Sequence, residues 1–98
     1  MYVIRFGKQA CKDKKLLKGA GLEQKAKTLL GIIAQDPFQN PPPYEGLVGN
    51  LSGYYSRRIN IQHRLVYQVY HEPVSIDGVE YEGEIKVVRM WSHYGSVR

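Results

Sequence analysis

Apolar positions in the first third of the chain change their spacing, and each spacing predicts a different element. Residues 1–6, MYVIRF, form a β-branched and aromatic run, which indicates a strand. Residues 8–18 carry a few apolar residues among lysines and predict a helix that stops near Gly19. In the next segment apolar residues recur at the spacing of one helical face, and Pro37 ends that second helix. These apolar residues are Leu22, Ala26, Leu29, Leu30 and Ile33.

The rest of the chain shows the short runs of β-prone residues that are typical of strands. A loop over residues 37–49, rich in proline and glycine, precedes two strands within residues 50–69. Asp77-Gly78 between β-prone residues predicts a type I′ hairpin, and residues 84–95 predict a last strand. The order is therefore β-α-α followed by an antiparallel β-meander. We expect an α+β fold with both helices on one side of the sheet.

Composition narrows the class of protein. The 98 residues suffice for a single domain, 1–98, with one modest core. Cys11 is the only cysteine, so no internal disulfide can form, and we expect it to be a half-buried anchor of the first helix beside Leu16 and Leu17. The sequence has no Cys/His cluster for a metal, no signal peptide and no apolar run long enough to span a membrane. We expect a cytoplasmic protein without a metal or other cofactor.

The net charge of +5 is distributed unevenly. Residues 1–70 contain eleven Lys and Arg against four Asp and Glu, whereas residues 71–98 contain three against five. An acidic partner is therefore expected to meet the first part of the chain. Nucleic acid is the commonest such partner of a small basic domain, although an acidic protein segment would also be attracted by this positive charge.

Arginines interrupt the best predicted strands, in the stretch NLSGYYSRRINIQHRLVYQV at residues 50–69. Strand side chains alternate between faces, so Arg58 and Arg64 converge only if the turn places them opposite each other. An isolated strand arginine usually lies on a solvated face, but clustered guanidiniums favour an anion such as phosphate. With Glu45 and His93, the chain has the residue types for phosphodiester cleavage by attack of a 2′-hydroxyl.

The pattern LSG-x-x-SRRI-x-x-x-HRLVY, together with a C-terminal SHY, resembles the YoeB/Txe branch of the RelE superfamily, toxins of bacterial type II toxin–antitoxin systems. The basic helices, the proline-rich loop and its acid follow in the expected order, so the resemblance covers essentially the whole chain. It implies a RelE-like microbial RNase fold and a ribosome-dependent, metal-independent endonuclease that cuts messenger RNA in the ribosomal A site. It also implies a cognate antitoxin as partner, and it leaves a homodimer open.

The resemblance further implies roles for individual residues. Glu45 matches the general base, Arg64 the arginine that stabilises the transition state, and His93 the general acid. Arg58 matches a residue that contacts phosphate, and Tyr94 matches the tyrosine that shapes the site and positions RNA.

Two further residues belong to the same motif without a single implied role. For Arg57 and His63, RNA binding and a structural duty both stay open.

Two features depart from the family pattern. The chain continues after the His-Tyr pair with Gly95–Arg98, which could change the placement of Tyr94. The Asp77-Gly78 hairpin is longer than the usual link between the last strands. It brings three acidic residues near one edge: Glu80, Glu82 and Glu84.

Two other functions are weighed against the endonuclease. A ParE-like protein that poisons DNA gyrase needs no Glu/His pair, whereas this chain has both residues in the expected order. A non-catalytic RNA-binding module follows from the basic charge alone. Activity that survives substitution of Glu45 and His93 but not of Arg64 would favour the binding module.

Overall fold

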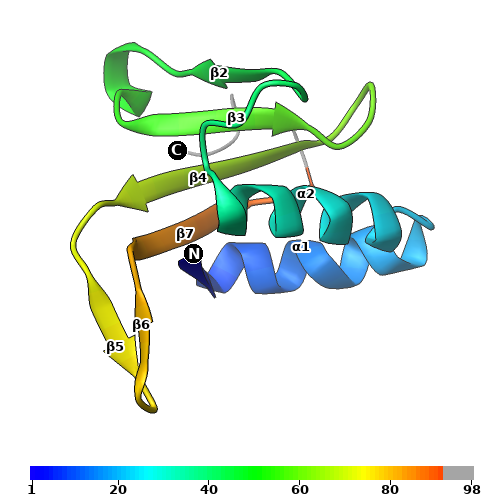
Figure 1. Ribbon diagram of the computed structural model, residues 1–98. Helices are drawn as coiled ribbons and strands as arrows, with labels where there is room; N and C mark the ends of the chain where they lie inside the picture. The colour runs from blue at the N-terminus through cyan, green and yellow to red at the C-terminus, as the bar shows by residue number, and fades with distance from the viewer. Residues whose placement is uncertain (92–98) are drawn as a thin grey trace.

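Two helices cover one face of a five-stranded sheet (Figure 1), in a computed structural model that describes residues 1–91. The helices are α1 (Lys8–Gly19) and α2 (Glu23–Gln35). The strands are β1 (Tyr2–Phe6), β2 (Tyr44–Gly46), β3 (Tyr54–Arg58), β4 (Arg64–Tyr70) and β7 (Gly83–Arg89), in the spatial order β1-β7-β4-β3-β2. The predicted α+β class, the first strand and both helices are confirmed. Neither of these helices is long and apolar enough to cross a membrane.

The predicted antiparallel meander after the helices is confirmed, and the first strand, which precedes it, joins the sheet in parallel. β2, β3, β4 and β7 pair antiparallel in series, whereas β1 joins β7 in parallel, with Tyr2 opposite Gly83 and Phe6 opposite Val87. The two helices supply the long connection that returns the chain to the sheet. The loop predicted over residues 37–49 also contains strand β2, which was not expected. Three residues are too few to show strand alternation, and β2 lies at the edge, where prolines are tolerated.

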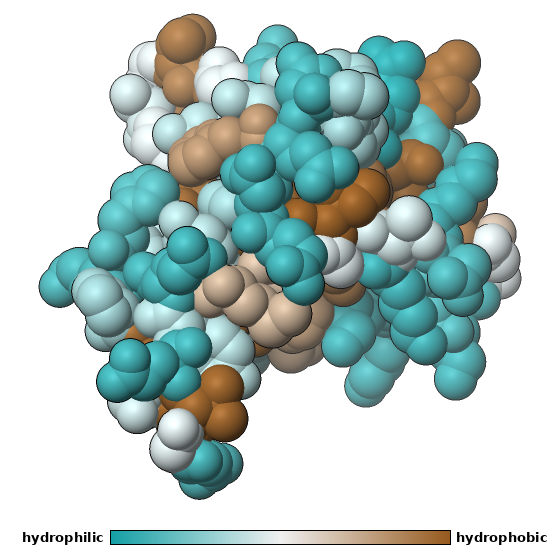
Figure 2. Space-filling model, viewed as in Figure 1, coloured by the Kyte–Doolittle hydropathy of each residue, from teal (hydrophilic) through white to brown (hydrophobic). Residues whose placement is uncertain are grey.

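The predicted hairpin is confirmed and stands apart from the main sheet. β5 (Val74–Ile76) and β6 (Val79–Tyr81) form a separate two-stranded sheet that projects from the domain (Figure 1). Asp77 and Gly78 have φ values of 50° and 79°, the left-handed conformation that a type I′ turn requires. Figure 2 shows this projection at the lower left, where hydrophilic side chains surround a small hydrophobic patch.

Two of the acidic residues beyond the hairpin are neutralised within the chain. Glu82 lies 2.6 Å from the N-terminal amino group of Met1, and Glu84 lies 3.1 Å from Nε of Arg5. The first pair is exposed and the second is partly exposed, so both contribute little stability.

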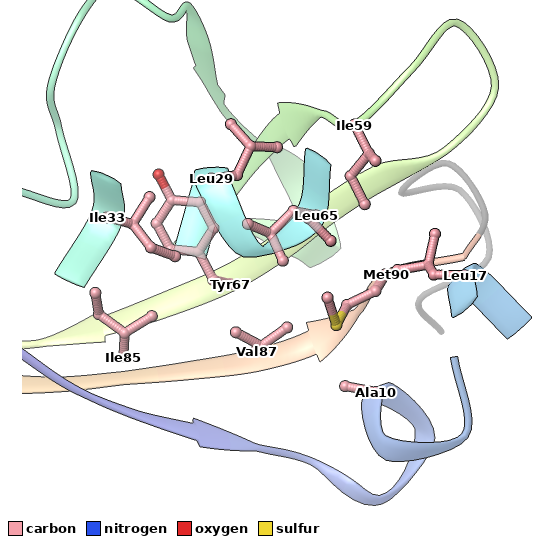
Figure 3. Close-up of a cluster of buried hydrophobic side chains, with 11 residues drawn as sticks. Ala10, Leu17, Leu29, Ile33, Ile59, Leu65, Tyr67, Ile85, Val87 and Met90 are labelled. Atoms are coloured by element: carbon pink, nitrogen blue, oxygen red, sulfur yellow. The ribbon is translucent and has the colours of Figure 1, made fainter. Parts of the chain in front are cut away.

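The core lies between the helices and the inner face of the sheet (Figure 3). The predicted apolar face of α2 is confirmed, because Ala26, Leu29 and Ile33 are all buried. Leu65 and Tyr67 of β4 point into the same cluster. Since strand side chains alternate, the intervening residues of β4 belong to the outer face of the sheet.

The buried face of α1 differs from the prediction. Cys11 is exposed and Leu16 is 47% exposed, whereas Ala10, Asp13 and Leu17 are buried. The latter three lie three and four residues apart and share one side of the helix. Hydrophobicity alone misplaced this face, because an aspartate occupies its central position.

Asp13 fastens α1 to the end of β7. Its carboxylate is fully buried and accepts hydrogen bonds from Nε of Arg89 at 2.8 Å and from the backbone N–H of Met90 at 2.9 Å. Gln9 donates to the other oxygen at 3.1 Å. Burial acts to raise the pKa of Asp13, but these hydrogen bonds and the Arg89 charge outweigh it, so the pKa lies below the ordinary value of 3.8.

We expect Gly83→Ala to lower the free energy of unfolding by about 1–3 kcal/mol, because an added Cβ would overlap the Tyr70 carbonyl oxygen and the Tyr2 ring. Gly31→Ala, on the exposed side of α2, has nothing within 4 Å of its new Cβ. It should instead stabilise the fold by about 0.5–1 kcal/mol. Urea unfolding measures both changes. A neutral Gly83→Ala would contradict the close packing of β4 and β1 against β7 at this position.

Asp13→Asn should lower the free energy of unfolding by about 3 kcal/mol at neutral pH, because it leaves Arg89 without its buried carboxylate. A lowered pKa means that ionised Asp13 stabilises the fold above pH 3.8 and loses this effect as the pH falls through the folded-state pKa. Urea unfolding across the acid range should therefore show a weaker pH dependence for Asp13→Asn than for the wild type. Asp77→Asn, on the exposed turn, is the matched control and should change little. Equal effects of both variants would argue against the buried pair.

Candidate functional site

The first of the paired strand arginines, Arg57, is buried beneath the proline-rich loop. Only 1% of its surface is exposed. Its guanidinium donates to the carbonyl oxygens of Pro42 at 2.7 Å and Pro37 at 3.0 Å, and its Nε donates to the Tyr67 hydroxyl at 3.1 Å. A buried charge is tolerated when its donors are paired, and these three bonds pair one donor from each nitrogen.

Aromatic side chains complete the enclosure of this guanidinium. The Tyr67 hydroxyl donates to the Pro37 carbonyl at 2.7 Å, and the Tyr44 ring centroid lies 5.0 Å from the guanidinium carbon. Burial raises the pKa of Tyr67 above 10, although the neighbouring Arg57 acts in the opposite direction. Tyr67 therefore stays protonated and keeps its hydrogen bond to the loop at any ordinary pH.

This network places Glu45. The two prolines that Arg57 binds lie in the segment before β2, and Tyr44 on β2 pairs with Arg57 on β3. The next pair along these strands is Glu45 with Ser56. Since neighbours alternate, Glu45 and Ser56 project to the outer face of the sheet, away from Arg57.

The register between β3 and β4, which the sequence left open, brings Arg58 and Arg64 together. The two residues are direct cross-strand partners. They have the same parity as Ser56 and Val66, which pair two positions further along, and so belong to the same outer face. Arg58 is exposed and Arg64 is half-buried. Diagonal neighbours such as Glu45 and Arg58 are about 7–8 Å apart across a ladder.

A surface hollow of about 340 Å³ lies over this part of the outer face. We call it the Glu45 hollow, and its lining is Pro43, Tyr44, Glu45, Ser56, Arg58 and Arg64. It joins one carboxylate to two guanidiniums on adjacent strands. Such a site suits a phosphodiester, because the arginines can bind phosphate oxygens and the carboxylate can accept a proton.

Ser56 is a member of the hollow that was missed in the sequence. It is 2% exposed, and its hydroxyl has no hydrogen-bond partner within residues 1–91. A buried hydroxyl without a partner is costly, and such groups occur at functional sites. The signal was present, because Ser56 lies two residues before Arg58 and therefore on the same strand face.

His63 precedes Arg64 in the chain but does not line the Glu45 hollow. His63 is 5% exposed, and its ring stacks on Trp91 with ring centroids 4.0 Å apart. Its backbone carbonyl accepts bonds from Ile59 and Asn60, which closes the turn between β3 and β4. Of the two duties left open for His63, RNA binding and a structural one, this placement fits the structural duty. The burial of Arg57 fits a structural duty as well. Neither side chain offers an exposed surface to RNA in this conformation.

His93 and Tyr94 lie outside the described residues, so their predicted roles carry forward as predictions. The described chain leads toward them through Met90 and Trp91, which are held by Asp13 and His63 respectively. Among residues 1–91, no three His, Cys, Asp or Glu side chains come close enough together to hold a metal ion.

Residues 6–94 match the family model described as a YoeB-like toxin of bacterial type II toxin-antitoxin system. Toxin YoeB of Synechocystis sp. is 54% identical over 57 residues, which make up 58% of this chain and 59% of that protein. The aligned part thus spans little more than half of this relative.

Two solved structures from Staphylococcus aureus are similar over nearly the whole chain. The YoeB dimer has 33% identity and a TM-score of 0.71, covering 95% of this chain and 98% of that one. The heterotetrameric YoeB-YefM toxin-antitoxin complex contains a chain with 33% identity and a TM-score of 0.69, covering 96% and 99%. These likenesses agree with the fold described above.

Arg57→Lys should lower the free energy of unfolding by about 2–4 kcal/mol, because one ammonium cannot reach both proline carbonyls and the Tyr67 hydroxyl. Arg58→Lys, the adjacent exposed residue, is the matched control and should cost less than about 0.5 kcal/mol. Thermal and urea unfolding give both values. If the two variants were equally stable, Arg57 would not hold the loop.

Proposed function

The chain belongs to the YoeB-like toxins of bacterial type II toxin-antitoxin systems, and from this premise we propose that it is a ribosome-dependent endonuclease that cuts messenger RNA in the ribosomal A site. The observation that carries this proposal is the Glu45 hollow, where one carboxylate and two guanidiniums line the same surface. The sheet that holds them is rigid, and donors that need no rearrangement stabilise charge best.

In the proposed reaction, Glu45 takes the proton of a 2′-hydroxyl. The 2′-oxygen then forms a bond to phosphorus while the bond from phosphorus to the 5′-oxygen breaks. His93 gives a proton to the leaving 5′-oxygen, so the products are a 2′,3′-cyclic phosphate and a 5′-hydroxyl end. Glu45 thus takes one proton and His93 gives one, so the step has no net change in protons. The proposed reaction is metal-independent.

The two arginines have separate proposed duties. Arg64 stabilises the negative charge that develops on the phosphoryl oxygens. Arg58, which lies on the neighbouring β-strand, binds a phosphate oxygen. Tyr94 positions the RNA beside His93. Bringing the reacting groups into line supplies much of the rate, so the ribosome acts by holding the message in the correct geometry.

The same premise extends to protein partners. Staphylococcus aureus YoeB was solved in a complex with YefM and also as a dimer. By this likeness, the present chain binds a cognate antitoxin that silences the site, and it can also form a homodimer.

Glu45→Gln and Arg64→Ala should each reduce cleavage of translated messages by about 10²–10⁴-fold, because one removes the base and the other a charged donor. The measurement is expression in a bacterial host with mapping of new 5′ ends on translated messages. Glu80→Gln, which changes an exposed acid on the distant hairpin, is the control and should cut like the wild type.

The outcomes discriminate between functions. In-frame ends that disappear in both site variants but persist in Glu80→Gln support the endonuclease. Growth arrest with intact messages and broken DNA would reject it in favour of gyrase poisoning. Equal cleavage of naked RNA and of translated messages would remove the ribosome from the mechanism.

A further inference from the structure

Ser56 occupies the floor of the Glu45 hollow. It is the smallest side chain that lines the hollow and is only 2% exposed, whereas Glu45 and Arg58 are exposed. Its strand, β3, lies between β2 and β4 (Figure 1), where Ser56 pairs with Glu45 on one side and with Val66 on the other. A ligand that enters the hollow therefore meets Glu45 and Arg58 first and Ser56 at the bottom.

The hydroxyl of Ser56 has no hydrogen-bond partner in the described part of the chain. The surrounding sheet explains why. The backbone of β3 is already paired on both sides, the Val66 side chain is apolar, and the Glu45 carboxylate does not bond to Ser56. The hydrogen and the lone pairs of this hydroxyl are thus available to a ligand.

Stability of the fold gives no reason for a hydroxyl at this position. A buried polar group without a partner costs free energy, and serine is not among the residues that are enriched in strands. Alanine would fill nearly the same space without a hydroxyl to desolvate. A ligand that supplies a hydrogen-bond partner would offset this cost.

The neighbours of Ser56 indicate which part of a nucleotide it meets. Cross-strand partners have Cβ atoms about 4.5–5.5 Å apart, so Ser56 and Glu45 can reach the same ligand atom. The pair formed by Arg58 and Arg64 lies two residues further along β3, about 6.5–7 Å away. In the proposed reaction Glu45 acts on the 2′-hydroxyl, whereas the arginines bind the adjacent phosphate. Ser56 therefore lies on the ribose side of the hollow.

A 2′-hydroxyl suits both members of the Glu45–Ser56 pair. It is a donor and an acceptor, and it is the group that distinguishes RNA from DNA. It can donate its hydrogen to the Glu45 carboxylate, while a lone pair of its oxygen accepts the hydrogen of the Ser56 hydroxyl. Phosphate oxygens, in contrast, only accept, and the two guanidiniums already supply donors for them.

We propose that Ser56 is a ribose-binding residue whose hydroxyl donates a hydrogen bond to the 2′-oxygen that Glu45 deprotonates. The inference rests on the proposed function, and it names the residue with which the hollow distinguishes RNA from DNA. Ser56 contacts the attacking oxygen and holds it beside Glu45, but it exchanges no proton with the RNA.

The test is an NMR titration of the full chain with adenosine 3′-monophosphate and with 2′-deoxyadenosine 3′-monophosphate. These nucleotides have the same base and phosphate and differ only in the 2′-hydroxyl, and the wild type should bind the ribonucleotide more tightly. Ser56→Ala should reduce this preference about three- to tenfold, the effect of one hydrogen bond, and leave the Kd of the deoxynucleotide within about twofold. Ser75→Ala, which changes an exposed serine of the β5–β6 hairpin, is the matched control and should keep the wild-type preference.

Urea unfolding of the same variants separates ligand binding from a structural role. Because the Ser56 hydroxyl makes no bond in the free chain, Ser56→Ala should not lower the urea midpoint in the absence of nucleotide. The same concentration of ribonucleotide should raise the midpoint of the wild type more than that of Ser56→Ala. A variant that is destabilised without nucleotide would overturn the assignment.

The remaining outcomes of the titration also decide the inference. Equal weakening of both nucleotides would assign Ser56 to the phosphate, and an unchanged preference would mean that Ser56 does not contact the 2′-oxygen, so either result would overturn it. Neither nucleotide contains a phosphodiester that can be cut, so the titration is independent of cleavage. A chain that cuts no messages but loses its ribose preference on Ser56→Ala would reject the endonuclease and retain the ribose site.

Discussion

The site depends on one buried guanidinium. Arg57 is 1% exposed, and it ties the carbonyls of Pro37 and Pro42 to Tyr67 in the middle of the sheet. Its hydrogen bonds give the proline-rich segment a fixed path to β2, a strand of only three residues at the edge of the sheet. Without this anchor, a short edge strand would have little to hold it. The position of Glu45 therefore follows from Arg57.

The neighbouring arginines have a different use because strand side chains alternate. Arg57 points to the layer of the helices, whereas Arg58 and Arg64 pair on the outer face beside Glu45. Of the three arginines in these strands, Arg57 is a buried residue that holds the loop by hydrogen bonds, and Arg58 and Arg64 line the surface hollow. Their cost to the core is small, since the apolar partners Leu65 and Tyr67 keep the inner face.

Sequence patterns predicted the helices and strands well, but they predicted less well which residues lie next to one another in the folded chain. Helix α2 followed from apolar periodicity, and the I′ turn followed from Asp77-Gly78. The convergence of Arg58 and Arg64 needed a strand register, which alternation alone cannot supply. The core position of Asp13 was hidden, because an aspartate there depends on Arg89, far away in the sequence. Glu45 was identified by motif resemblance, while its strand was not.

The central claim is that Arg58 and Arg64 meet the RNA phosphate while Arg57 holds the loop. NMR tests this claim directly. The arginine side chains are labelled with 15N, and the chain is titrated with a short RNA whose 2′-oxygens are methylated to block cleavage. The account predicts that the Nε–H signals of Arg58 and Arg64 shift with RNA and that the signal of Arg57 stays in place. A shift of Arg57 with unchanged Arg58 and Arg64 would contradict it.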